Sequence, residues 1–252
     1  MAKRVGATRR DGVPADVLRG LNDGSLESAT LAEGLAVDFH ALLRAVAPDL
    51  PAASRAAVRP GDGITARMRA AGEALLAYYG LDGLPRFAAH PSDTVRGWAA
   101  HMVAAAPRLT LSQRLRQIRP LADDPHFGVR EWAWMSLRGA VAADVPAAIR
   151  LLTPWATDPS ANIRRFASEV ARPRGVWCAH IELLKAEPEH GLPLLEPLRS
   201  DPSKYVRDSV ANWLNDAGKT RPEWVREVCA RWLRESPAPE TRHLVTRATR
   251  NL

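Results

Sequence analysis

The sequence predicts an all-α protein built from stacked helix pairs, and two observations carry this prediction. A short phrase, Asp-Pro-x-x-x-Val-Arg or a close variant, occurs four times, with its arginines 34, 34 and then 43 residues apart. A period of this size on helical sequence is typical of α-solenoids, in which each helix pair packs against the next. No segment of any length alternates apolar and polar residues as a half-buried strand would. We therefore expect a HEAT-like solenoid, an αα-superhelix, of about twelve helices.

The first 13 residues are basic and rich in glycine, and we expect them to form a flexible tail. The remainder, 14–252, is expected to be one helical-repeat domain. Before the repeats, the apolar spacing predicts helices over 14–21, 25–46 and 64–79. Thr30, with Glu33 three residues later, has the pattern of a capping box at a helix N-terminus.

The repeats are clearest from about residue 86 to residue 252. Each one has a proline near the start of its second helix, where the missing N–H costs no hydrogen bond. The third step is longer because it carries an insertion over 172–177 that contains two helix breakers, Pro173 and Gly175. We expect this insertion to be a loop on one face of the solenoid.

The charge balance favours a polyanionic partner, because the formal net charge is +7 and the pI is about 10.1. The sequence has no run of 18 apolar residues, and its basic N-terminus lacks the apolar stretch of a secretory signal. The two cysteines, Cys178 and Cys229, are expected to stay reduced. No Cys/His pair has zinc-ligand spacing. We therefore expect a cytoplasmic protein without a metal site.

The repeated arginine, numbered as position 0, sorts the second helix of each repeat into two faces. Positions −1, +3 and +6 or +7 are apolar or small and form the core face, whereas positions +1, +5 and +9 lie opposite. The polar residues at the opposite positions include Glu131, Arg165, Glu169, Asp208, Asn212 and Asp216. In a curved solenoid the second helices line the concave surface, where ligands bind. A plain solvated face is the alternative, because exposed helix positions are normally charged.

The arginines of the phrase itself have a structural interpretation. We expect them to pair with aspartates in the loops between repeats. The arginines are Arg96, Arg130, Arg164 and Arg207, and the aspartates include Asp124, Asp158 and Asp201.

The insertion holds a tryptophan, Trp177, next to Arg172 and Arg174. An aromatic side chain among arginines can stack on a base or sugar while the arginines hold phosphate. A buried anchor for the loop is the alternative interpretation of Trp177.

Three segments carry a resemblance to a known family: 127–131 (FGVRE), 163–177 (IRRFASEVARPRGVW) and 205–216 (YVRDSVANWLND). They resemble the AlkC/AlkD-type HEAT-like repeat DNA alkylation-repair glycosylases, and among these the AlkC branch. The resemblance covers residues 86–252 well, and residues 22–33 also resemble the N-terminal segment of some relatives.

The resemblance implies a solenoid that grips duplex DNA in a concave basic groove. It also implies hydrolysis of the N-glycosidic bond of cationic alkylated bases of the 3-methyladenine type, without deep base flipping. Glu169, Asp216 and Glu131 would be the catalytic acids, and Arg165 and Trp177 would contact the lesion or its backbone. The further DNA-binding residues that we expect are Arg172, Arg174, Lys204, Asp208 and Asn212. No metal or cofactor is required, and the protein is expected to act as a monomer.

Two other functions stay open from the sequence. One is a non-catalytic HEAT-like protein that binds damaged or branched DNA. The other is a protein-interaction scaffold, the role that most helical arrays of this kind have.

Overall fold

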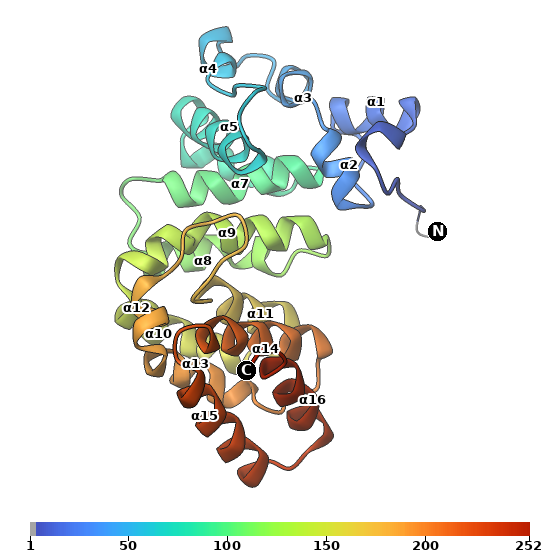
Figure 1. Ribbon diagram of the computed structural model, residues 1–252. Helices are drawn as coiled ribbons and strands as arrows, with labels where there is room; N and C mark the ends of the chain where they lie inside the picture. Colours follow the sequence, from blue (N-terminus) through green and yellow to red (C-terminus); the bar gives the residue numbers. More distant parts are fainter. Residues whose placement is uncertain (1–3) are drawn as a thin grey trace. The chain divides into compact units, whose positions relative to one another are not determined.

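The computed structural model describes residues 4–252, and its regular structure is helical (Figure 1). No residue in that range lies in a strand, which confirms the all-α prediction. Within 4–252 there are sixteen α-helices, more than the number expected, because several of them are short helices of four to six residues. By its contacts the chain separates into an N-terminal unit that ends at Ser136 and a C-terminal unit that begins at Leu137.

The helices of the N-terminal unit are α1 (Ala15–Asp23), α2 (Leu31–Ala36), α3 (Phe39–Val46), α4 (Ala52–Ala56), α5 (Ile64–Tyr79), α6 (Leu84–Ala88), α7 (Asp93–Ala105) and α8 (Leu111–Ala122). Helix α9 (Phe127–Ala143) begins in this unit and ends in the next. The single helix expected over 25–46 is wrong, because α2 and α3 are separate. The carboxylate of Asp38 accepts the backbone N–H groups of His40 and Ala41 and so starts a new helix at Phe39.

The segment 4–13 lies against α2, although the sequence analysis places it in a flexible tail. The Arg4 Nη2 and Glu33 Oε2 atoms are 2.6 Å apart, and the Ala7 N–H donates to the same carboxylate. Thr30 caps α2 as predicted, since its hydroxyl accepts the Glu33 N–H. The Glu33 carboxylate accepts the Ala29 N–H, one residue before the cap. Residues 1–3 of the expected tail lie outside the described residues.

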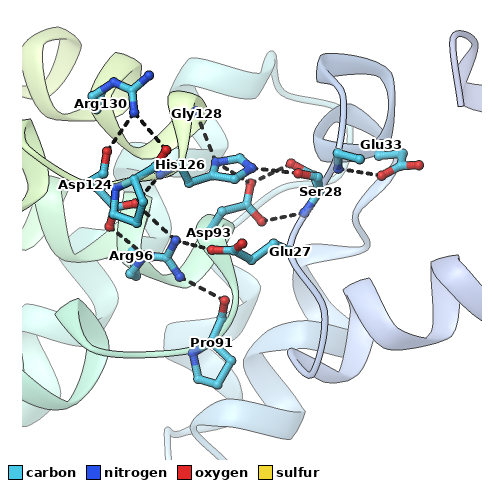
Figure 2. A network of polar contacts seen from close by, with 12 residues as sticks. Glu27, Ser28, Glu33, Pro91, Asp93, Arg96, Asp124, His126, Gly128 and Arg130 are labelled. Atoms are coloured by element: carbon cyan, nitrogen blue, oxygen red, sulfur yellow. Dashed lines mark hydrogen bonds and ion pairs between the residues drawn. The ribbon is translucent and has the colours of Figure 1, made fainter. Parts of the chain in front are cut away.

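The segment before α2 is joined to the starts of α7 and α9 by a buried polar network (Figure 2). Asp93 accepts both the hydroxyl of Ser28, at 2.6 Å, and its backbone N–H, at 3.0 Å. The ring of His126 contacts the Ser28 carbonyl oxygen through Nε2 at 2.6 Å. Arg96 and Asp124 border the same network, beside a cavity of about 840 Å³. These groups satisfy one another, which fixes the N-terminal segment on the first repeats.

Each phrase arginine is bonded within its own phrase, and Arg96 and Arg164 also form the predicted pairs with loop aspartates. In each phrase, arginine Nη1 donates to the carbonyl oxygens of the first two phrase residues, and these are His90 and Pro91, Asp124 and Pro125, Asp158 and Pro159, and Asp201 and Pro202. Arg96 Nε also donates to Asp124 of the next phrase at 2.8 Å, and Arg164 Nε to Asp201 at 2.6 Å. The apolar residue before each arginine is fully buried, which confirms the core face, and these residues are Val95, Val129, Ile163 and Val206.

The helices that follow α9 in the C-terminal unit are α10 (Val145–Leu152), α11 (Ala161–Val170), α12 (Glu182–Ala186), α13 (Leu192–Leu195), α14 (Lys204–Gly218), α15 (Pro222–Glu235) and α16 (Pro239–Ala248). Helix α14 packs against α11 on one side and α16 on the other (Figure 1). Trp213 on α14 is fully buried and donates its indole N–H to the Ala171 carbonyl oxygen at 2.9 Å. This hydrogen bond fixes the end of α14 beside the end of α11.

Helix α16 begins with a fifth copy of the phrase that the sequence analysis missed. Residues 236–242 read Ser-Pro-Ala-Pro-Glu-Thr-Arg, and Arg242 Nη1 donates to the Pro237 carbonyl oxygen as the other phrase arginines do to their prolines. Thr241 takes the place of the buried valine and is itself fully buried. Ser236 takes the place of the aspartate, and Arg207 Nε is buried without a hydrogen-bond partner. The series of arginine–aspartate pairs therefore ends at Ser236.

Candidate functional site

Two carboxylates of the C-terminal unit share one guanidinium. Glu169 lies near the end of α11 and Asp216 near the end of α14, and Arg172 follows α11 by two residues. Arg172 Nη1 donates to Glu169 Oε1 at 2.6 Å, while its Nε and Nη2 donate to Asp216 Oδ2 at 2.9 and 2.7 Å. The predicted catalytic acids Glu169 and Asp216 are thus brought together by a residue that the sequence analysis assigns to DNA.

Both carboxylates are buried, with 3% of Glu169 and 5% of Asp216 exposed. The expectation that they stand on an exposed face is therefore wrong. The apolar periodicity predicts which face of a single helix is buried. It gives no information about the segment after α11, from which Arg172 pairs with both carboxylates. Arg172 supplies the charge that makes burial of both acids possible, since an unpaired buried carboxylate would be strongly destabilising.

Further groups hold Glu169 in its ionised form. The Ser209 hydroxyl donates to Glu169 Oε2 at 2.6 Å, and Arg165 Nη2 lies 3.7 Å from the same oxygen. Burial opposes ionisation, but the charges of Arg165 and Arg172 and the Ser209 hydrogen bond outweigh it and keep the pKa of Glu169 below its ordinary value. The side chain is therefore a fixed negative charge at neutral pH.

Asp216 has a different environment at each oxygen. Both Arg172 donors reach Oδ2, whereas Oδ1 lies 3.5 Å from Lys219 Nζ. Arg174 donates from Nε to the Asp216 backbone carbonyl oxygen at 3.2 Å. The insertion thus contributes two arginines to the end of α14, one at the carboxylate and one at the backbone.

The insertion is a loop, as predicted, and a buried arginine holds its base. Arg138 donates to the carbonyl oxygens of Val170, Arg172 and Ala179 at 3.2, 2.5 and 2.9 Å. Trp177 at the loop tip is 53% exposed and has a φ of 61°. Of the two interpretations of Trp177, the buried anchor is therefore wrong.

The other predicted site residues make further contacts, in the C-terminal unit for Arg165, Lys204, Asp208 and Asn212 and in the N-terminal unit for Glu131. Arg165 stacks over the Tyr205 ring, with 4.3 Å between the guanidinium carbon and the ring centroid. Glu131 belongs to the N-terminal unit and accepts the Trp134 indole N–H at 2.7 Å. Lys204, Asp208 and Asn212 lie on the first turns of α14, and Lys204 pairs with Asp208 at 2.5 Å.

Sequence reasoning missed Ser209, Lys219 and Arg138. Ser209 stands at position +2 of its repeat, beside the core, where a serine gives no functional signal by itself. Arg138 lies in the second half of α9, where the sequence contains no indication of the loop it holds. Only Lys219, three residues after Asp216, could have been found as a neighbour of a predicted acid.

Across residues 4–252, no cluster of three or more His, Cys, Asp or Glu side chains has an arrangement that could hold a metal ion. None of the helices in this range is long and apolar enough to cross a membrane.

The fold and the site define a class: an α-helical repeat protein in which neighbouring second helices hold a buried pair of acids. Among solved structures, the chain is similar to the alkylpurine DNA glycosylase AlkC of Pseudomonas fluorescens bound to DNA that contains an abasic site analogue. The two share 25% identity and a TM-score of 0.65, over 94% of this chain and 62% of AlkC. The resemblance to AlkC/AlkD-type proteins is thereby confirmed.

Two structures from Streptococcus mutans share the fold at lower identity. AlkD2 matches with 19% identity and a TM-score of 0.62, over 82% of this chain and 99% of AlkD2. The protein smu.31 matches with 20% identity and a TM-score of 0.60, over 73% of this chain and 91% of smu.31.

Among curated proteins, the uncharacterized protein YhaZ of Bacillus subtilis is 46% identical over 88 residues, which are 35% of this chain and 24% of YhaZ. The chain thus spans less than two thirds of both AlkC and YhaZ. No family model matches the chain.

Proposed function

We propose that this protein is a DNA glycosylase of base excision repair that releases cationic alkylated bases of the 3-methyladenine type from duplex DNA. The observation that carries the proposal is the Glu169–Arg172–Asp216 cluster, in a fold similar to that of DNA-bound AlkC. The basic balance of the chain, with a net charge of +7, agrees with a DNA partner. We also propose that it works as a cytoplasmic monomer without a metal.

The proposed reaction requires negative charge in the site rather than a proton donor. A 3-methylated adenine already carries a positive charge, so its bond to deoxyribose is weak and the leaving base needs no general acid. The remaining tasks are to stabilise an oxocarbenium-like sugar and to deliver water to C1′. Ionised carboxylates suit both tasks.

The contacts divide these tasks between the two acids. Both oxygens of Glu169 already accept hydrogen bonds, from Arg172 and Ser209, so we assign it the role of a fixed charge that stabilises the developing cation. Asp216 Oδ1 lies 3.5 Å from Lys219 Nζ, a longer contact than those at Oδ2, and we assign this oxygen to the attacking water. In this proposal, entry of the lesion opens access to the pair, which is buried in the free protein.

Arg165 and Trp177 are proposed to contact the lesion or the sugar-phosphate beside it. Trp177 is exposed at the tip of the insertion and can stack on a base without displacing any core group. For Glu131 the family resemblance alone supports a catalytic role, and its hydrogen bond to Trp134 keeps the carboxylate in one orientation.

One observation favours a second function, which is DNA binding without catalysis. The burial of Glu169 and Asp216 is also what a purely structural ion cluster would show. Under this alternative the protein binds DNA and releases no base.

Release of 3-methyladenine from methylated duplex DNA tests the two functions. We expect release by the wild type, and a fall of about 100- to 1000-fold in the single-turnover rate for Glu169→Gln and for Asp216→Asn. The matched control is Glu227→Gln, which changes an exposed glutamate on α15 of the same unit.

Circular dichroism and thermal unfolding establish that each variant is folded. Equal rates for folded wild type, Glu169→Gln and Asp216→Asn would remove the catalytic assignment. DNA binding by a wild type that releases no base would favour the second function.

A further inference from the structure

The surface where α16 meets α14 carries exposed cations, of which Lys204 alone is predicted from the sequence. The fifth phrase copy places α16 in register with α14, so that Arg242 corresponds to Arg207. Counted from Arg242, positions +1 and +5 of α16 are His243 and Arg247. They are the counterparts of Asp208 and Asn212 on α14.

The contacts between the two helices connect these corresponding positions. Arg247 Nε and His243 Nε2 lie 3.6 and 3.7 Å from Asp208 Oδ1, and Lys204 Nζ lies 2.5 Å from Asp208 Oδ2. Arg250 Nη2 donates to Asn212 Oδ1 at 3.2 Å. Lys204, His243 and Arg247 therefore lie around the single carboxylate of Asp208. Partial burial opposes ionisation of this carboxylate, but the Lys204 hydrogen bond and the nearby charges of Arg247, Lys204 and His243 lower the pKa of Asp208.

This cluster has a net positive charge that faces solvent. Lys204, Arg247 and Arg250 contribute three permanent charges, against the single charge of Asp208. The side chains of Lys204, His243 and Arg247 are 65%, 47% and 42% exposed. Exposed and already oriented cations are the groups that hold phosphate oxygens.

The cluster lies on the face of α14 that leads to Asp216. Asp208 and Asp216 are eight residues apart in one helix, which is about 12 Å along its axis. Successive phosphates of one DNA strand advance about 3.4 Å along the duplex axis, so for a duplex that runs along α14 this separation corresponds to roughly three or four nucleotides.

We propose that the duplex runs along α14 and that Lys204, His243, Arg247 and Arg250 form a surface that binds its phosphates three or four nucleotides from the excised base. The proposal rests on the proposed function for its partner, duplex DNA. Asp208 and Asn212 act here by orienting the cations, rather than by contacting DNA themselves. The surface sets the register of the duplex on the C-terminal unit and carries no base specificity.

Fluorescence anisotropy of a 25-base-pair duplex with a central tetrahydrofuran abasic analogue tests the surface, because it reads binding without base release. We expect Arg247→Gln/Arg250→Gln to weaken binding about tenfold at 0.1 M salt. We also expect the slope of log K against log salt concentration to fall by about 2, because two phosphate contacts are lost. The glutamines keep much of each side chain, and both positions are at the surface.

The matched control is Arg226→Gln/Arg234→Gln, which removes two exposed arginines from α15 of the same unit. We expect its salt slope to equal that of the wild type. Equal losses in the two double variants would show a general charge effect and overturn the proposal, as would an unchanged slope in Arg247→Gln/Arg250→Gln.

A truncated duplex separates this proposal from the proposed function. Shortening the duplex to two base pairs on one side of the analogue should abolish the difference between wild type and Arg247→Gln/Arg250→Gln for one of the two sides. A difference that survives both truncations overturns the phosphate placement. If the wild type releases no base while this pattern is observed, the glycosylase function fails and the phosphate-binding surface stands.

Discussion

Arg172 directs two N–H groups at a single oxygen of Asp216, from Nε at 2.9 Å and from Nη2 at 2.7 Å. Its remaining hydrogen-bonded nitrogen, Nη1, reaches Glu169. The guanidinium is therefore the shared counterion of two buried acids, and these donors are occupied before any DNA arrives. We propose that Arg172 positions the acids, whereas the sequence alone suggests a phosphate contact.

Removal of this counterion should be costly. In Arg172→Met, Glu169 and Asp216 stay buried without their shared partner, so we expect the free energy of unfolding at pH 7 to fall by about 3–5 kcal/mol. Urea denaturation measures the change. Arg234→Met, at an exposed position of α15, serves as the control and should change stability by less than about 0.5 kcal/mol. A loss below about 1 kcal/mol in Arg172→Met would show that the cluster is solvated in solution.

Stability should also depend on pH through His101. Burial, with a smaller effect from the charge of Arg69, lowers the pKa of His101 from 6.5 to about 4. Between these two values the unfolded chain binds more protons than the folded protein, so stability rises with pH across this window. We expect this group to reduce the free energy of unfolding by about 2 kcal/mol at pH 5 relative to pH 7.

The comparison of wild type with His101→Gln isolates that contribution in urea denaturation at the two pH values. The glutamine cannot titrate, so the variant should lose about 2 kcal/mol less than the wild type between pH 7 and pH 5. Identical pH dependences of wild type and His101→Gln would contradict a buried neutral imidazole.

The sequence predicts the scaffold more completely than it predicts the site. The valines and arginines of the phrase recur at fixed spacing because each repeat packs against the next in the same way. One pattern therefore predicts that both Val95 and Val206 are buried. The burial of Glu169 depends on Arg172, in an insertion that no other repeat has, and periodicity contains no information about it. The fifth phrase is not recognised in the sequence because Ser236 replaces the aspartate and Thr241 replaces the valine that define the pattern.

The end of the arginine–aspartate series offers a stabilising substitution. Arg207 Nε is buried without a partner where Arg164 Nε has Asp201, and the fifth phrase supplies Ser236 at the equivalent position. We expect Ser236→Asp to raise the free energy of unfolding by about 1 kcal/mol, because the new carboxylate satisfies that donor. Urea denaturation measures the gain. In an Arg207→Met background the same substitution should give no gain, and a gain that persists there would have another cause.

Replacement of Trp177 should affect DNA binding and stability differently: DNA affinity should fall, whereas the free energy of unfolding should not. A tryptophan with a φ of 61° occupies the left-handed region that favours glycine, and this side chain is 53% exposed and so contributes little to the core. Trp177→Gly should therefore leave the free energy of unfolding unchanged or raise it by up to about 1 kcal/mol. If the indole stacks on a base, the same variant should bind the abasic duplex more weakly by about 1–3 kcal/mol.

The control for the loop is Val176→Ala, which changes the exposed neighbour of Trp177 and should change neither quantity by more than about 0.5 kcal/mol. Urea denaturation and anisotropy give the two values on the same protein samples. A variant that loses stability while it binds DNA normally would make Trp177 a structural residue and remove it from the site.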